Sequence, residues 1–256
     1  MPHSQRFSLA GRRALITGSS QGIGLALARG LAEAGAAVIL NGRDEKKLAA
    51  AVATLRAEGH AAESAVFDVT NATAIESAVA GLLSGGRAID ILVNNAGIQI
   101  RAPLLQMSPE NWQKVIDTNL SSAFLVARTV VPGMIARQAG KIVNICSVAS
   151  DLARPTIGPY TAAKGGLRTL TRSMCVEWAK ENLQINALSP GYILTEMTRP
   201  LADDPKFDTW VKGRTPAARW GTVNDLVGAC VFLCSPAANF INGHNLFVDG
   251  GFTVST

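Results

Sequence analysis

The chain alternates short apolar runs with longer segments whose apolar residues recur at helical spacing. The apolar runs lie at residues 14–17, 36–40, 61–67, 90–93, 141–146, 183–188 and 245–248. Between them, apolar residues return every three or four positions, as Leu48, Val52 and Leu55 do. The pattern therefore predicts seven strands alternating with helices, which are expected at residues 25–34, around 48–55, and at 75–83, 112–134, 160–180 and 223–233.

This alternation is typical of a parallel sheet, because parallel strands must be joined by crossover segments that are usually helices. We therefore predict an α/β fold, a doubly wound parallel sheet of about seven strands with helices on both faces, in a single domain over residues 1–256. Residues 192–221 fall outside the alternation and hold three prolines and two tryptophans. An insertion this long often forms a lid, so we expect a substrate loop there.

Composition narrows the class of protein. The 256 residues are 48% hydrophobic and 17% charged, with a formal net charge of +5. A basic balance can indicate nucleic-acid or acidic-membrane binding, but Lys and Arg are scattered singly or in pairs. No run of about 18 apolar residues is present, and the chain begins without a cleavable leader pattern. We therefore expect no nucleic-acid partner, no membrane and a cytoplasmic location.

The four cysteines also favour a cytoplasmic location. Cys146, Cys175, Cys230 and Cys234 form no zinc-ligand pattern with each other or with histidine. Reduced, buried thiols are the expected state, which favours a reducing compartment. No other metal-ligand motif appears, and we predict no metal site.

A glycine-rich turn joins the first predicted strand to the first predicted helix. It reads GSSQGIG over residues 18–24. Glycines there let backbone N–H groups approach a pyrophosphate at the positive end of the helix. The spacing differs from the common GxGxxG fingerprint, and a tight strand-to-helix connection is the alternative. Its place between the first strand and helix favours nucleotide binding.

The end of the second strand bears on which nucleotide binds. In dinucleotide folds this end meets the adenosine ribose, where an acid binds the 2′-hydroxyl and an Arg accommodates a 2′-phosphate. This chain has neutral Asn41 and cationic Arg43. NADP(H) is therefore favoured, with NAD(H) left open. The alternative is that Arg43 only begins an exposed helix capped by Asp44.

Two further strand ends carry polar groups at the edge where such sheets bind ligands. The third strand ends in Asp68 and Val69, and Asp68 either accepts from an adenine amino group or caps the helix near Asn71. The fourth strand is closed by NNAG at residues 94–97, whose residue types favour a turn.

The candidate chemistry follows the fifth strand. Ser147 stands at its carboxyl end, and Tyr160 and Lys164 lie four residues apart, on one face of the next helix. A free tyrosine has a pKa of about 10, which a nearby ammonium lowers. We therefore expect Lys164 to lower the pKa of Tyr160, which then exchanges the substrate's hydroxyl proton while Ser147 hydrogen-bonds the reacting oxygen. Tyr-x-x-x-Lys is common by chance, and its position after a strand-end serine is what favours catalysis.

Together these motifs resemble the short-chain dehydrogenase/reductase family. TGSSQGIG (17–24), Asp68, NNAG (94–97) and the 190–195 segment that holds nicotinamide match in order along the whole chain. The resemblance implies a Rossmann sheet ordered 3-2-1-4-5-6-7 and, commonly, a homotetramer. It implies a water ordered by Asn119 beside Lys164. The family's NADP(H) users often carry a basic residue where this chain has Gln21. The implied catalytic residues are Asn119, Ser147, Tyr160 and Lys164.

The motifs and the resemblance together predict one set of cofactor-binding residues. These are Gly18, Ser20, Gln21, Ile23, Gly24, Arg43, Asp68, Val69, Asn95, Ala96, Gly97, Tyr160, Lys164, Pro190, Gly191, Ile193 and Thr195.

A narrower resemblance is to one subgroup of that family, the gluconate 5-dehydrogenases. SDLARP (150–155), RTPAARWG (214–221) and NGHNLFVDGG (242–251) carry it. Ile100 stands where a second Arg is expected, and Asp151 where Glu is expected. The resemblance implies a sugar-acid substrate, and exposed loop arginines are the alternative for the two Arg residues involved. The implied substrate residues are Gln99, Arg101, Ser147, Asp151, Arg154 and Tyr160.

We therefore expect an oxidoreductase that transfers a hydride between NADP(H) and a sugar acid, D-gluconate or its 5-dehydro form. Two enzyme alternatives stay open: a 3-oxoacyl-carrier-protein reductase and another sugar or polyol dehydrogenase. A non-catalytic nucleotide-binding regulator is a third, and the complete Asn, Ser, Tyr and Lys set argues against it.

Overall fold

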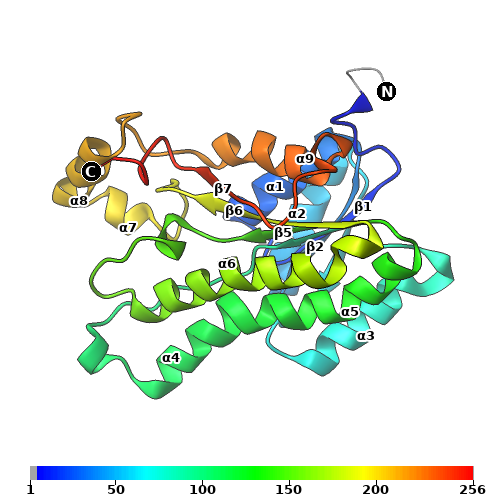
Figure 1. Ribbon diagram of the computed structural model, residues 1–256, viewed down its shortest axis with the longest axis horizontal. Helices are drawn as coiled ribbons and strands as arrows, with labels where there is room; N and C mark the ends of the chain where they lie inside the picture. The colour runs from blue at the N-terminus through cyan, green and yellow to red at the C-terminus, as the bar shows by residue number, and fades with distance from the viewer. Residues whose placement is uncertain (1–4, 256) are drawn as a thin grey trace.

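One parallel seven-stranded sheet organises the chain (Figure 1). The computed structural model describes residues 5–255, so the expectation about the start of the chain rests partly on residues 1–4, outside the described residues. The strand order is β3-β2-β1-β4-β5-β6-β7, as the family resemblance implied. The predicted fold class is therefore confirmed. The strands are β1 (Arg13–Ile16), β2 (Ala37–Gly42), β3 (Ala62–Val66), β4 (Ile91–Asn94), β5 (Gly140–Ile145), β6 (Leu183–Pro190) and β7 (Asn245–Val248).

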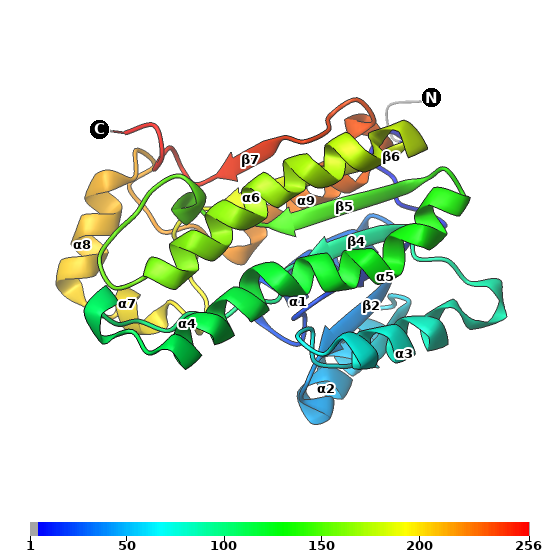
Figure 2. The same ribbon diagram turned by 60° about the horizontal axis from the view of Figure 1, so that its bottom comes forward.

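Helices cover both faces of the sheet. In Figures 1 and 2, α1, α2 and α9 lie on one side, and α3, α5 and α6 lie on the other. Two hydrophobic clusters correspond to these two layers. The helices are α1 (Gly22–Glu33), α2 (Glu45–Ala57), α3 (Ala72–Leu83), α4 (Pro109–Ile116), α5 (Ser122–Ala136), α6 (Gly158–Trp178), α7 (Arg199–Ala202), α8 (Pro205–Arg214) and α9 (Val227–Cys234).

The strand period divides the core between these layers. Successive strand residues point to opposite faces, and the parallel register aligns like-facing residues of neighbouring strands. Ile16 pairs with Leu40 of β2 and Val93 of β4, and all three are buried in the layer of α1, α2 and α9. Leu15 and Ile39, one residue earlier, are buried in the opposite layer. Near-continuous apolar strands are therefore required here, because both faces are covered.

The long helix predicted at residues 112–134 is interrupted. A π-helical turn, Asp117–Ser121, separates α4 from α5. The whole segment Pro109–Ala136 is long and apolar enough to cross a membrane by length and composition. However, Val126, Val130 and Met134 are buried in the core beneath the sheet. The segment is packed as a core helix.

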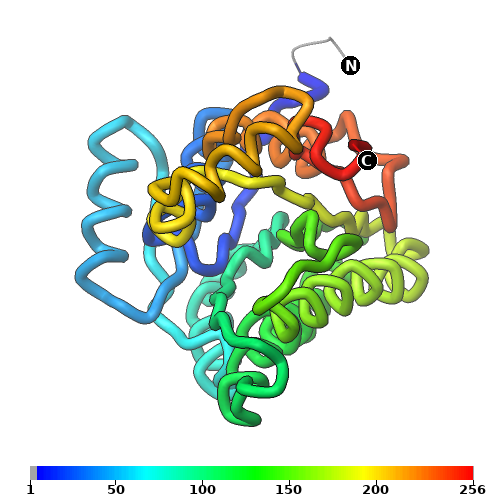
Figure 3. Tube along the Cα trace, turned by 90° about the vertical axis from the view of Figure 1, so that its left-hand side faces the viewer, coloured from blue at the N-terminus to red at the C-terminus, as the bar shows by residue number. Residues whose placement is uncertain are grey.

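The insertion at residues 192–221 is partly helical. It contains α7 and α8, which lie at the end of the molecule towards which β5 and β7 point (Figure 2). Figure 3 looks onto that end, with α7 and α8 in yellow and orange in front of the sheet. Its position beside the carboxyl ends of the strands is the one expected for a substrate loop.

Candidate active site

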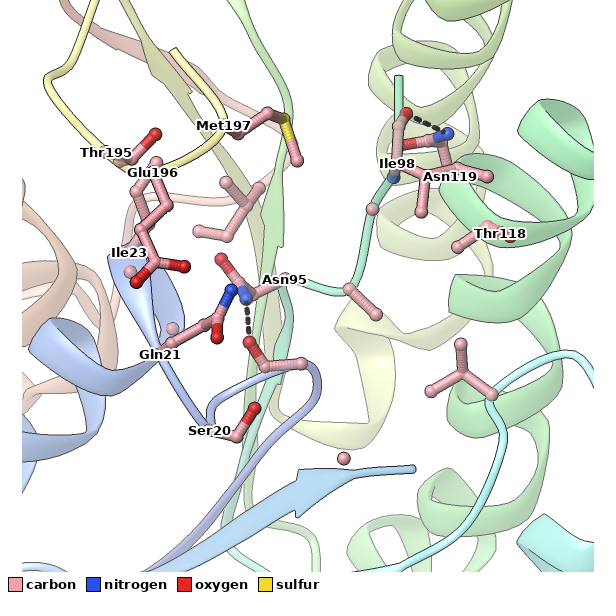
Figure 4. Close-up of a pocket in the computed structure, with 18 of the residues that line it drawn as sticks. Ser20, Gln21, Ile23, Asn95, Ile98, Thr118, Asn119, Thr195, Glu196 and Met197 are labelled. Carbon is pink, nitrogen blue, oxygen red and sulfur yellow. Dashed lines mark hydrogen bonds between the residues drawn. The ribbon is translucent and has the colours of Figure 1, made fainter. Parts of the chain in front are cut away.

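A cavity of about 530 Å³ opens at the carboxyl edge of the sheet. Its walls are the turns that follow β1 to β6, with parts of α1, α2 and α6, of the π-helical turn between α4 and α5, and of the insertion. Figure 4 shows part of the lining, with Gln21 and Ile23 at the start of α1 and Thr118 and Asn119 across the cavity. Every residue predicted for catalysis or cofactor binding lines this one cavity. The sheet therefore brings these residues together, as the strand-end argument required.

The glycine turn is held rigidly against β2. The Gly18 amide donates to the Asn41 side-chain oxygen at 3.2 Å, and the Ser19 amide donates to the Asn41 carbonyl at 2.8 Å. The Gln21 side chain does not cap α1, and the first turn of α1 carries no acid. The amides at the start of α1 and the positive end of the helix dipole are therefore left for an anion, which fits a cofactor diphosphate.

Gly24 fits this turn only because it lacks a side chain. A Cβ at Gly24 would lie 2.4 Å from the Gly18 carbonyl oxygen and 2.5 Å from the Asn95 side-chain nitrogen. That nitrogen donates to the Thr17 and Gly18 carbonyl oxygens at 2.9 Å each. The close approach ties the end of β4 to the glycine turn.

The end of the cavity expected to hold the adenosine has a cation, Arg43, beside a buried neutral residue, Asn41. Asn41 is buried, and its side-chain amide donates to the carbonyl oxygens of Ala65 and Phe67 at 3.0 and 3.1 Å. Arg43 is exposed and lies 3.5 Å from the Asp68 carboxylate. Burial favours a higher pKa for Asp68, but hydrogen bonds from Thr70 and the Arg43 charge hold it below its usual range. Asp68 does not cap α3, since Asn71 caps it by accepting from the Ala74 amide.

Lys47 is a cavity residue that the sequence analysis missed. It stands in the first turn of α2, four residues after Arg43, and lines the same end of the cavity. Arg43 precedes the helix, so the available signal was a second cation in the first turn of the helix, close in sequence to Arg43.

The strand turns at the other end of the cavity are equally tight. The Asn95 and Ala96 amides both donate to the Thr17 hydroxyl, at 2.9 and 3.0 Å. A Cβ at Gly97 would lie 2.6 Å from the Asn119 side-chain oxygen, and one at Gly191 would lie 2.7 Å from the Asp249 Cα. Backbone at these strand ends therefore forms a close-fitting wall for a flat ring.

Ser147, Tyr160 and Lys164 form a buried constellation in this cavity. Ser147 follows β5, and its hydroxyl accepts from the Ala149 amide at 3.1 Å and hydrogen-bonds Tyr160. Tyr160 lies in the first turn of α6, with Lys164 one turn later. The Lys164 ammonium donates to the Ile145 carbonyl at 2.6 Å and lies 5.7 Å from the centre of the Tyr160 ring. The spacing therefore places hydroxyl, phenol and ammonium side by side.

The expectation that Lys164 lowers the pKa of Tyr160 is wrong for this structure. Burial raises the pKa of Tyr160, and the hydrogen bond from Ser147 only partly opposes this rise. Burial also lowers the pKa of Lys164 to about 8. The ammonium donates its hydrogen bond to the Ile145 carbonyl, and none is formed with the phenol. The neighbouring Cys146 thiol has its pKa raised by burial to about 11.

Asn119 lies in the π-helical turn, a feature frequent at functional sites. Its side-chain nitrogen donates to the carbonyl oxygens of Ile98 and Val115 at 2.9 and 2.8 Å, and its oxygen accepts from the Ile98 amide at 3.1 Å. Figure 4 shows it bonded to Ile98. The side chain is therefore committed to the backbone and fixes the wall beside Gly97.

The other predicted substrate residues lie outside the cavity lining. Gln99 accepts from the Arg101 guanidinium at 2.9 Å, and the Arg154 guanidinium stacks on the Phe207 ring, 4.6 Å from its centre. Asp151 has a partner that the sequence did not reveal, because its carboxylate forms an ion pair with Arg168 of α6. The structure therefore leaves the two arginines available and gives Asp151 a structural contact.

Comparison with known proteins agrees with this geometry. The profile of a family described as "Enoyl-(Acyl carrier protein) reductase" matches residues 18–253. A gluconate 5-dehydrogenase from Gluconobacter oxydans is 53% identical over 255 residues, covering 100% of both chains. A 5-keto-D-gluconate 5-reductase from Escherichia coli K12 is 49% identical over 249 residues, covering 97% of this chain and 98% of that protein.

A solved structure is also similar to this chain in sequence and in fold. It is a gluconate 5-dehydrogenase from Burkholderia cenocepacia in complex with NADP and tartrate. It is 54% identical in sequence, covers 99% of each chain and superposes with a TM-score of 0.97.

Proposed function

The chain belongs to the short-chain dehydrogenase/reductase family, and from that membership we propose that it interconverts D-gluconate and 5-keto-D-gluconate with NADP(H). One observation carries the proposal. The constellation of Ser147, Tyr160 and Lys164 lines a dinucleotide-sized cavity, in a chain 53% identical over its full length to a gluconate 5-dehydrogenase.

The residues of this cavity suit hydride-transfer chemistry. A nicotinamide held in this cavity would accept a hydride from the alcohol carbon, or supply one to the ketone carbon. In oxidation the hydroxyl proton passes to the Tyr160 oxygen, and in reduction the Tyr160 hydroxyl protonates the new alkoxide. Ser147 hydrogen-bonds the same substrate oxygen and holds it beside Tyr160. Lys164 supplies a positive charge near the phenolate that forms.

Cofactor choice follows from the adenosine end of the cavity. Arg43 and Lys47 present two cations there, whereas Asn41, at the end of β2, is neutral and buried. A 2′-phosphate would be held by these cations, and the relative from Burkholderia cenocepacia was solved with NADP. Gln21 provides no charge in the glycine loop, so discrimination depends on Arg43 and on Lys47 of α2.

The Lys47→Ala variant is expected to raise the KM for NADPH about 10-fold, because a charge-assisted contact to the 2′-phosphate is lost. The KM for NADH should stay within about 2-fold, because NADH lacks that phosphate. Steady-state kinetics with both cofactors measures the change. Lys46→Ala is the matched control, since Lys46 is the exposed neighbour that does not line the cavity. Equal effects of Lys47→Ala on both cofactors would contradict the assignment.

A substrate panel tests the proposed activity directly. We expect oxidation of D-gluconate with NADP⁺ and reduction of 5-keto-D-gluconate with NADPH. An acetoacetyl thioester, the test substrate for 3-oxoacyl-carrier-protein reductases, should be turned over at least about 100-fold less efficiently. Arg101 and Arg154 form no ion pair within residues 5–255, so their charges favour an anionic substrate. Preference for the thioester would instead favour a 3-oxoacyl-carrier-protein reductase. The family description also names an acyl-carrier-protein substrate.

We also propose that the enzyme is a cytoplasmic homotetramer of single-domain chains. Phe124 of α5, Val176 of α6 and Phe240 before β7 are large apolar side chains exposed on outer surfaces, which suits subunit contacts. The four cysteines are free, as expected in a reducing compartment. Sedimentation of one species with the mass of four chains would support the assembly, and a monomer would refute it.

A further inference from the structure

Tyr192, the second tyrosine of the chain, has no role in the proposed hydride-transfer step. It lies two residues after the end of β6, between Gly191 and Ile193, which both line the cavity. Its ring is the centre of an aromatic cluster. The ring centroids of Phe207, Trp210, Trp220 and Phe252 lie 5.1–5.7 Å from its own, all at edge-on angles. This cluster fixes the ring against α8, so its hydroxyl has a defined direction.

The Tyr192 hydroxyl lies beside the Arg154 guanidinium, because the Tyr192 ring and the guanidinium both pack on the Phe207 ring. Burial raises the pKa of Tyr192, while the Arg154 and Arg101 charges and a hydrogen bond with Arg154 act to lower it. The Arg154 guanidinium is held from a second side by the Phe207 ring, at 4.6 Å. Arg154 is therefore oriented by two residues of the insertion, although it belongs to the loop between β5 and α6.

Arg101, in the loop after β4, lies close enough to Arg154 for the two charges to interact. The Ala102 amide donates to the Thr156 carbonyl at 3.1 Å, which joins the loop after β4 to the loop after β5. Burial and the Arg154 charge lower the pKa of Arg101, and Tyr192 and Tyr160 oppose this effect. Loops from three adjacent strands, β4, β5 and β6, therefore converge around Tyr160.

The two arginines lack negative partners. Within residues 5–255, neither Arg101 nor Arg154 forms an ion pair with a carboxylate. The nearest candidate by sequence, Asp151, is paired with Arg168. Arg101 is exposed and Arg154 is partly exposed, and two like charges without a counter-ion are stabilised when an anion binds between them.

We propose that Tyr192 is a positioning residue that holds Arg154 towards the carboxylate of the sugar acid, and so sets the preference for acids over neutral polyols. Arg101 and Arg154 bind the carboxylate, and Tyr192 fixes the guanidinium of Arg154 from behind. This inference rests on the proposed function, because it concerns the substrate of the same site. It also gives the insertion a role, because α8 carries Phe207 and Trp210 of the cluster that orients Tyr192.

Tyr192→Phe tests the proposal, because it removes the hydroxyl and keeps the ring in its cluster. The KM for D-gluconate should rise about 10-fold while kcat changes less than about 3-fold, since a hydrogen bond to a charged group is lost away from the reacting atoms. The kcat/KM for D-sorbitol, a neutral polyol, should be unchanged. The ratio of the two kcat/KM values is the readout that a merely structural role would not move.

Trp210→Phe is the matched control, since it alters an aromatic of the same cluster that does not contact Arg154. It should leave the D-gluconate to D-sorbitol ratio unchanged. A Tyr192→Phe variant that keeps its D-gluconate KM, or loses both substrates equally, would overturn the proposal.

A binding measurement separates this inference from the proposed activity. Trp210 and Trp220 border Tyr192, so their fluorescence can follow D-gluconate binding to the cofactor complex without turnover. Wild-type protein that binds D-gluconate more tightly than Tyr192→Phe supports the inference even if it does not oxidise D-gluconate, a result that would refute only the proposed reaction. Equal binding, or no binding by either protein, overturns the inference.

Discussion

Tyr160→Phe is expected to lower kcat/KM for 5-keto-D-gluconate by about 10³-fold, with a loss of similar size for D-gluconate oxidation. Phenylalanine keeps the ring in its buried place in the first turn of α6 but removes the only group that exchanges the proton. Steady-state assays in both directions measure the loss. The dissociation constant for NADP(H) should stay within about 3-fold, because the glycine turn and the adenosine end are unchanged. Activity within about 10-fold of wild type would exclude Tyr160 as the acid–base group.

The pH dependence of the wild type gives a second check on the same group. Burial raises the pKa of Tyr160, so the phenol is protonated at neutral pH and ready to donate in ketone reduction. Oxidation needs the phenolate and should therefore accelerate as pH rises. Lys164, whose pKa is about 8, loses its charge above that pH and stabilises the phenolate less, so reduction should decline there. A reduction rate that climbs between pH 8 and 10 would contradict this assignment.

The positions of the strands, and the fact that the site residues lie in one cavity, could be predicted because both follow from local sequence patterns. Apolar runs of strand length, joined by helical segments, allow essentially one kind of sheet. In such a sheet the ends of β1, β2, β4, β5 and β6 lie at one edge, so the residues after each strand share a cavity. Tyr160 and Lys164 required only the helical repeat to be placed together.

The pKa of Tyr160 and the contacts of Asp151 and Tyr192 could not be predicted from the sequence, because they depend on residues that only folding brings together. Proximity of Lys164 suggested a lowered pKa for Tyr160, but burial raises this pKa and the hydrogen bond from Ser147 only partly opposes the rise. The pairing of Asp151 with Arg168 needs two segments brought together by folding, and charge type alone does not reveal it. Tyr192 was likewise overlooked, because its significance comes from an aromatic cluster spread over residues 192–252.

The glycine turn offers the second large effect, on cofactor binding and stability together. Gly24→Ala places a Cβ 2.4 Å from the Gly18 carbonyl oxygen and 2.5 Å from the Asn95 side-chain nitrogen. The turn cannot easily retreat, because the Gly18 and Ser19 amides are bonded to Asn41. Overpacking of this kind costs about 1–3 kcal/mol, and each hydrogen bond lost from Asn95 adds about 1 kcal/mol.

We therefore expect Gly24→Ala to reduce the free energy of unfolding by about 2–4 kcal/mol and to weaken NADP(H) binding at least about 30-fold. The second effect follows because the overlap displaces the first turn of α1, whose amides would face the diphosphate. Urea denaturation and fluorescence titration measure the two changes. Gly228→Ala in α9 is the matched control, because its added Cβ meets nothing within 4 Å. That control should stabilise the fold by about 0.5–1 kcal/mol and leave cofactor binding unchanged. If Gly24→Ala binds NADP(H) as tightly as the wild type, the turn does not hold the diphosphate.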